Sequence, residues 1–171
     1  RLMFPFPGSL VLRSLGGTLP ALVENSARTV GAREIMDSGP VFLPERGGPS
    51  LPVIRRQEIL PTDGRDRRLA VCSFALSLLA DDRRRALFVE LSACAEHTLF
   101  LDFKLPERNL EWPAFLLASP LRQIASRGRL EAEGGMEGML YKEKARFTVL
   151  NRYSLKGGAL CAVLVRNQLS A

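Results

Sequence analysis

The sequence predicts one α/β domain built on a mostly parallel β-sheet, with an antiparallel hairpin at its C-terminal end and an irregular N-terminal third. Two short, continuously apolar runs, at 69–74 and 97–103, have the composition of strands buried on both faces. A helical repeat lies between them, and alternating strands and helices favour a parallel sheet. Two more apolar runs, at 146–154 and 159–165, flank the sequence KGG at 156–158, which is typical of a hairpin.

The length of 171 residues, with 46% apolar and 25% charged residues, is that of a single globular domain spanning 1–171. No apolar run is long enough for a transmembrane helix, and two prolines interrupt the apolar start, so we expect neither a membrane partner nor a signal peptide. The widely spaced Cys72, Cys94 and Cys161 each lie in an apolar stretch and are interpreted as small core residues. With one His and no Cys/His cluster, we expect no metal site and a cytoplasmic location.

The net charge of +6 raises the question of a nucleic-acid partner. The arginines cluster at 55–56, 65–68 and 83–85, but acidic residues are interleaved with them. Aromatic residues are not interleaved as they are in surfaces that bind single strands. The pattern therefore favours solvated faces, and nucleic acid remains the less favoured partner.

Prolines and glycines punctuate residues 1–52, so few elements are predicted there. The segment 10–15 suits either a strand or a helical turn, and 19–27 has helical spacing with a proline in its first turn. A short strand is expected at 33–36, ending at Asp37, followed by a turn-rich loop at 38–52.

Residues 53–171 are better patterned, and their elements are predicted in order along the chain. The helical stretch 75–94 contains a second helix start at Asp81 and Asp82. The remaining expectations, besides the strands and hairpin above, are a strand at 53–60, a turn at 61–66, a loop at 105–111 and helices at 112–124 and 136–142.

Three segments of this half, 69–79 (LAVCSFALSLL), 99–114 (LFLDFKLPERNLEWPA) and 151–166, resemble consecutive parts of class I S-adenosylmethionine-dependent methyltransferases. They are similar to the fourth strand with its following loop, the fifth strand with its exit loop, and the closing hairpin. The resemblance covers roughly residues 53–167. It implies a Rossmann-like methyltransferase sheet of seven strands, in which the last strand is antiparallel and inserted between the fifth and the sixth.

The resemblance also implies a cofactor, S-adenosylmethionine, and a small-molecule acceptor, and it leaves a homodimer open. Ligands of open α/β sheets lie outside the carboxyl ends of the strands. On that basis the expected cofactor-binding residues are Gly16, Gly17, Asp37, Glu58, Ser73 and Phe74. The expected acceptor-binding residues are Asp102, Glu107, Arg108 and Trp112, and no catalytic residue is assigned.

One part of the family pattern is degenerate, the D/E-x-G-x-G-x-G loop that normally follows the first strand. The preferred substitute is the segment 12–18 with Gly16 and Gly17, which makes Asp37 the acid that binds ribose. A second placement takes 33–39 (REIMDSG) as the loop, but leaves too few residues before 69–74 for the missing strands and helices.

Each site residue also has a purely structural interpretation. The paired glycines can be a simple turn, Asp37 a loop residue, Glu58 a solvated acid at a strand end, and Ser73 with Phe74 core packing. Asp102 can be a carboxylate satisfied by backbone N–H groups, and the polar residues after it can form an exit loop.

The sequence therefore supports two functions. One is a methyltransferase acting on a small molecule, with an open apolar cleft at the strand ends. The alternative is a non-catalytic relative that serves as a binding or oligomerisation module, with the cleft filled by side chains such as Arg33 or Phe42.

Overall fold

The computed structural model describes residues 17–39, 43, 49–55, 64–104, 134–155 and 160–168. Within these ranges the chain forms a six-stranded mixed sheet in the order β2-β1-β3-β4-β6-β5. The first four positions are parallel neighbours, and β6 runs antiparallel to both β4 and β5. The predicted α/β class, the mostly parallel sheet and the C-terminal antiparallel hairpin are confirmed.

The strands at the centre of the sheet are the most apolar ones, as the sequence predicts. They are β3 (Arg68–Ser73), buried along its whole length, and β4 (His97–Phe103), buried after its first residue. The flanking strands are β1 (Glu34–Asp37), β2 (Val53–Arg55), β5 (Phe147–Leu155) and β6 (Leu160–Asn167). β6, the last described strand in the chain, is inserted into the sheet between β4 and β5.

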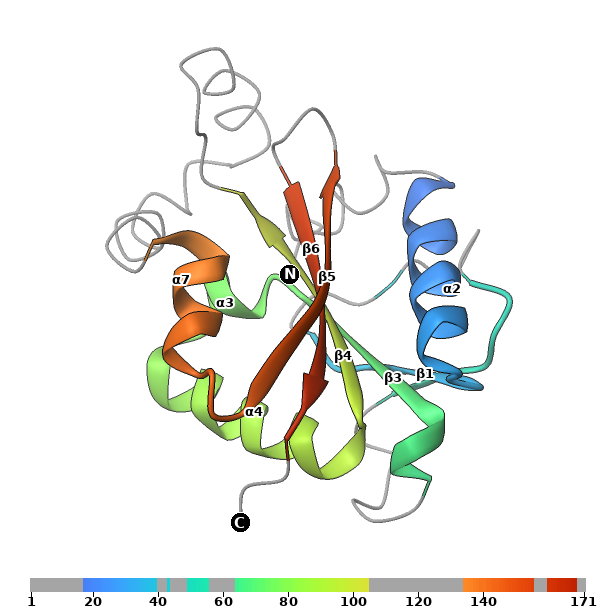
Figure 1. The fold of residues 1–171 in the computed structure, drawn as a ribbon, viewed down its shortest axis with the longest axis horizontal. Helices are drawn as coiled ribbons and strands as arrows, with labels where there is room; N and C mark the ends of the chain where they lie inside the picture. Colours follow the sequence, from blue (N-terminus) through green and yellow to red (C-terminus); the bar gives the residue numbers. More distant parts are fainter. Residues whose placement is uncertain are drawn as a thin grey trace, which may run out of the picture.

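Helices cover both faces of the sheet (Figure 1). α2 (Thr18–Val30) lies on one face, and α4 (Asp81–Cys94) and α7 (Gly135–Lys142) lie on the other. α2 ends at Gly31, whose left-handed backbone (φ 70°) lets its N–H bond to the carbonyls of Ala27 and Arg28. The short helices are the 3₁₀ turn η2 (Arg65–Arg67) and α3 (Ala75–Leu78).

The core on the α4 face contains a three-ring aromatic cluster. The rings of Phe88, Phe100 and Phe147 pack edge to face, with centroids 5.0 to 5.7 Å apart. They come from α4, β4 and β5, so the cluster ties the outermost strand to the centre of the sheet.

The cysteines are free, with Cys72 and Cys94 buried and Cys161 partly buried, as expected of small core residues. Burial raises the pKa of the Cys161 thiol to about 12. No helix in the described part of the chain is both long and apolar enough to cross a membrane.

Candidate functional site

The chain changes direction across the sheet between β1 and β3. From β1 it moves outward to β2, and it then returns to pair β3 with the opposite side of β1. In open α/β sheets, such a reversal marks the place of the ligand-binding crevice, outside the carboxyl ends of the strands on either side of it, here β1 and β3. The residues at these two ends are Asp37 and Ser73.

Gly39 brings the two strand ends into direct backbone contact. A Cβ atom on Gly39 would overlap the backbone nitrogen of Ser73 and lie 2.8 Å from its carbonyl oxygen. The preceding Ser38 N–H donates to the carbonyl of Val71 at 3.0 Å, which continues the pairing of β1 with β3 past its last residue. Only glycine fits here, because no side chain can stand between two backbones this close.

Ser73 presents a buried hydroxyl at the carboxyl end of β3. The residue is fully buried, and its Oγ has no hydrogen-bond partner among the described residues. A buried polar atom without a partner is costly and is found at functional sites more often than elsewhere. Ser73 therefore has an unused donor and acceptor at the switch point of the sheet.

The next residue, Phe74, makes a sharp turn. Its φ of 59° and ψ of 21° put a bulky residue in the left-handed region, which is an outlier for such a side chain. Its N–H donates to the carbonyl of Leu101 at 2.7 Å, and its ring packs on Phe103 with centroids 4.9 Å apart. These contacts hold the strained turn that ends β3 against β4.

Asp102 is a structural carboxylate rather than an open acceptor contact. Its Oδ2 accepts the N–H groups of Leu76 and Ser77 at 3.0 and 3.1 Å, and its Oδ1 accepts that of Phe103 at 2.8 Å. The residue is 1% exposed, and this burial raises the pKa of its carboxyl from 3.8 to about 6 despite the hydrogen bonds from Ser77, Phe103 and Leu76. Asp102 thus anchors α3 beside the strained turn.

Asp37 is also turned inward. It is 3% exposed, and its Oδ2 accepts the backbone N–H of Leu43 at 2.6 Å. The carboxylate therefore holds the backbone of Leu43 beside the end of β1.

The described sheet agrees with the second placement of the cofactor loop, because β1 pairs directly with β3. The preferred placement stays a prediction, since the residues before Gly17 lie outside the described residues. The segment 33–39 contains β1, and Asp37-Ser38-Gly39 leads into the crevice. The second placement leaves too few residues for a full set of strands and helices, and in the described chain β2 is the one strand between β1 and β3.

Gly39 is a candidate site residue that the sequence places only in the second version of the loop, and that is not among the expected cofactor-binding residues. The available signal was an acid and a glycine two residues apart, directly after a short strand, which is the start of the D/E-x-G pattern. Arg33, a side chain expected to fill the cleft of a non-catalytic relative, is exposed and precedes β1 at the opposite edge of the sheet.

Five residues predicted for the site lie outside the described residues: Gly16, Glu58, Glu107, Arg108 and Trp112. The same holds for Phe42 and for the helix expected at 112–124. Within the described ranges, no three His, Cys, Asp or Glu side chains are grouped so that they could hold a metal ion.

One solved structure shows the fold of this chain in another protein. No protein-family model matches the sequence, and no curated protein matches it. The solved structure of the methyltransferase domain of bacterial CtHen1-CN is similar over 86% of this chain and 96% of that chain, with a TM-score of 0.50 and 12% identity. LepI, solved with SAH and a substrate analogue, is similar over 90% of this chain but 41% of its own length, with a TM-score of 0.47 and 13% identity. The chain shares the fold of a methyltransferase domain.

Proposed function

We propose that this chain is an S-adenosylmethionine-dependent methyltransferase that acts on a small molecule. The observation that carries the proposal is the backbone contact between Gly39 and Ser73 at the switch point, with the Ser73 hydroxyl buried there without a partner in the described chain. A glycine and a hydroxyl without a partner in the described chain, at the ends of neighbouring parallel strands, suit a nucleoside-bearing ligand.

The residues at the crevice fit part of the family's cofactor loop. Asp37 and Gly39 stand where the acid and the first glycine of D/E-x-G-x-G-x-G stand, while Val41 and Leu43 replace the later glycines. Under this placement, Glu58 is the acid that follows the second strand, the position that binds the ribose hydroxyls in the family. Gly39, Ser73 and Glu58 are thus the residues assigned to hold the cofactor.

The cofactor supplies a methyl group that its sulfonium has already activated. The task of the chain is then to hold donor and acceptor in line and to exclude water, which is catalysis by proximity and orientation. The rigid turn at Phe74, fixed by Asp102 through α3, serves this alignment, because it holds the end of β3 in one geometry. No side chain is assigned as a general base.

The test is isothermal titration with S-adenosylmethionine and S-adenosylhomocysteine, comparing Ser73→Ala with Ser26→Ala. Both serines are fully buried, and the Oγ of each lacks a hydrogen-bond partner in the described chain, but Ser26 lies in α2. Both variants should keep the free energy of unfolding within about 1 kcal/mol of wild type, because no described hydrogen bond is lost. Only Ser73→Ala should weaken the cofactor, by about three- to tenfold.

Two results would count against the proposal. The first is folded wild-type protein that binds neither ligand at millimolar concentration. The second is equal weakening by both serine variants, which would place the effect outside the crevice. Glu58→Gln extends the test, because loss of the ribose acid should weaken both ligands while thermal unfolding stays unchanged.

The non-catalytic relative remains the second candidate because of Asp37. Its carboxylate is occupied by the N–H of Leu43, a buried residue at a position where the family loop has glycine. A carboxylate that already accepts a backbone N–H of its own chain suits a scaffold protein that no longer binds a cofactor. Failure of both titrations would favour this function.

A further inference from the structure

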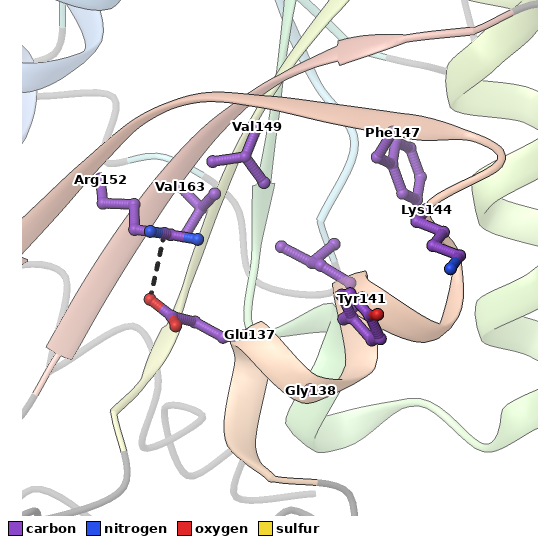
Figure 2. Close-up of a pocket in the computed structure, with 9 residues that line it drawn as sticks. Glu137, Gly138, Tyr141, Lys144, Phe147, Val149, Arg152 and Val163 are labelled. Atoms are coloured by element: carbon purple, nitrogen blue, oxygen red, sulfur yellow. Dashed lines mark ion pairs between the residues drawn. The ribbon is translucent and has the colours of Figure 1, made fainter.

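A cavity of about 360 Å³ lies between α7 and the outer strands of the sheet, away from the switch point (Figure 2). Its volume falls within the range of small-molecule sites, roughly 300 to 1,000 Å³. The lining residues used below come from both sides of the cavity: Glu137, Tyr141 and Lys144 from α7 and the turn after it, and Phe147, Val149 and Arg152 from β5.

A β-bulge in β5 shapes the sheet side of this cavity. Val149 pairs with Val165 and Asn151 pairs with the next residue, Leu164, so Leu150 is an extra residue in the strand. Side chains on a regular strand alternate, and two residues three apart would point to opposite faces. The extra residue restores Arg152 to the face of Val149, so both line the same cavity.

The floor of the cavity is apolar, and its rim leaves apolar surface exposed. Leu140, Phe147 and Val163 are buried at the floor. Tyr141 and Val149 at the rim are 69% and 41% exposed, unusually high for large apolar side chains. Exposed apolar surface gathered around a hollow marks an interaction site. A ligand with a flat apolar body would cover the Tyr141 ring and the floor together.

The charged groups at the rim are one acid and two bases. Arg152 Nε lies 3.2 Å from Glu137 Oε1, and Lys144 Nζ lies 5.1 Å from the centre of the Tyr141 ring (Figure 2). The Arg152–Glu137 pair is more than 60% exposed on both sides, so it contributes little and is easily rearranged. The excess positive charge beside an aromatic ring favours an anionic ligand, and a guanidinium offers paired donors to a carboxylate.

We propose that this cavity binds a small planar aromatic carboxylate, with the ring against Tyr141 and the floor and the carboxylate at Lys144. The site is separate from the proposed cofactor crevice, because β4 and β6 lie between β3 and β5. At the usual strand spacing that separation is on the order of 10 Å or more, beyond the contact distance that methyl transfer requires. The bound compound would therefore not be the methyl acceptor.

The probe is 2-naphthoate, titrated calorimetrically and by ¹⁵N chemical-shift mapping, with neutral 2-naphthol and cationic 2-naphthylmethylamine as comparisons. Naphthoate should bind more tightly than either and shift the amides of Tyr141 and Val149 but not those of Gly39 and Ser73. Lys144→Gln should weaken naphthoate by about three- to fivefold, and Tyr141→Ala by about tenfold. Lys144→Glu should reverse the preference toward the amine.

Two matched controls carry the same chemical changes away from the cavity. Lys142→Gln removes a cation at the end of α7, two residues before Lys144, at a residue that does not line this cavity, and Val89→Ala truncates an exposed apolar side chain of α4. Neither should alter naphthoate binding. Equal effects of Lys142→Gln and Lys144→Gln would overturn the proposal, as would binding of the three probes without preference. A dimer in light scattering that Tyr141→Ala converts to monomer would also overturn it, because a second copy would then be the occupant.

Discussion

Asp102 shows how one side chain serves the fold through three backbone hydrogen bonds. Its carboxylate binds the N–H groups at the start of α3 and that of Phe103, so it links β4 to the turn that ends β3. This carboxylate is almost fully buried, and burial raises its pKa to about 6. A group that serves an N–H cluster usually has a lowered pKa, so desolvation outweighs the hydrogen bonds here.

The raised pKa predicts a specific pH dependence of stability. Between 3.8, the ordinary pKa of an Asp carboxyl, and about 6, the native protein holds a proton that the unfolded chain has lost. The free energy of unfolding contributed by this group therefore falls as the pH rises through that window, and it is constant above it. Asp102→Asn does not titrate, so urea unfolding across the window should show the difference between wild type and variant shrinking as the pH rises.

Glu24 is a control, because its pKa is shifted in the opposite direction to that of Asp102. Its Oε1 accepts the backbone N–H of Ser50 at 2.6 Å, and this hydrogen bond lowers the pKa of the Glu24 carboxyl below 4.5. Its contribution to stability is present at neutral pH and is lost as the pH falls through the lowered pKa. If Asp102→Asn and Glu24→Gln changed the pH profile in the same direction, the assignment of the Asp102 proton would be wrong.

At the scale of elements, the parallel strands β1 and β3 approach each other too closely at Gly39 and Ser73 to admit a side chain between them. Their ladder runs from Glu34 opposite Arg68 to Asp37 opposite Val71, and the contact of Gly39 with Ser73 continues it beyond the last pair. The edge where the proposed cofactor would bind is therefore the tightest junction between these two elements.

Gly39→Ala tests this junction. The new methyl group overlaps the backbone nitrogen of Ser73, and backbone cannot rotate away as a side chain can. The variant should lose about 1 to 3 kcal/mol of unfolding free energy by urea denaturation. Gly17→Ala is the matched change, since an added Cβ there meets nothing within 4 Å. A loss for Gly39→Ala no larger than that for Gly17→Ala would show that the two strands separate freely.

At the scale of the whole molecule, Asn167 joins three elements at the end of the sheet where the parallel strands begin. Its side-chain Nδ2 donates to the carbonyls of Ala95 and Leu91 at 2.9 and 3.3 Å, and it also lies 2.8 Å from Thr98 Oγ1. One buried amide thus joins the end of β6 to the end of α4 and the start of β4.

Asn167→Ala should lower the free energy of unfolding by about 1 to 3 kcal/mol, because the buried Ala95 carbonyl and Thr98 hydroxyl lose the hydrogen bonds of the Asn167 amide. Thermal unfolding by calorimetry should remain one transition, since the strands on either side stay paired. The adjacent Gln168→Ala removes an exposed amide contact with Thr148 and should change stability by less than about 0.5 kcal/mol. Equal losses for the two variants would contradict the role given to Asn167.

The sequence predicted much of this molecule and missed one junction. The bounds of β4 agree at both ends, and the restart of the helix at Asp81 was recognised, because a continuous apolar run and a pair of acids are local signals. β1 has four residues, and so short a segment has no pattern that could predict its place beside β3 at the switch point. The role of Gly39 depends on Ser73, which only the folded sheet brings beside it.

The place of β6 has a consequence for how the protein is made. β5 pairs with β6 alone in the described sheet, and β4 lacks its second neighbour until β6 arrives, yet β6 is synthesised after both. Until the residues of β6 have been synthesised, β4 and β5 each have an unpaired edge. Unpaired strand edges are the surfaces through which unfinished chains aggregate most readily. The sheet is therefore completed after β6 has emerged, and a nascent chain stopped short of it should need a chaperone to remain soluble.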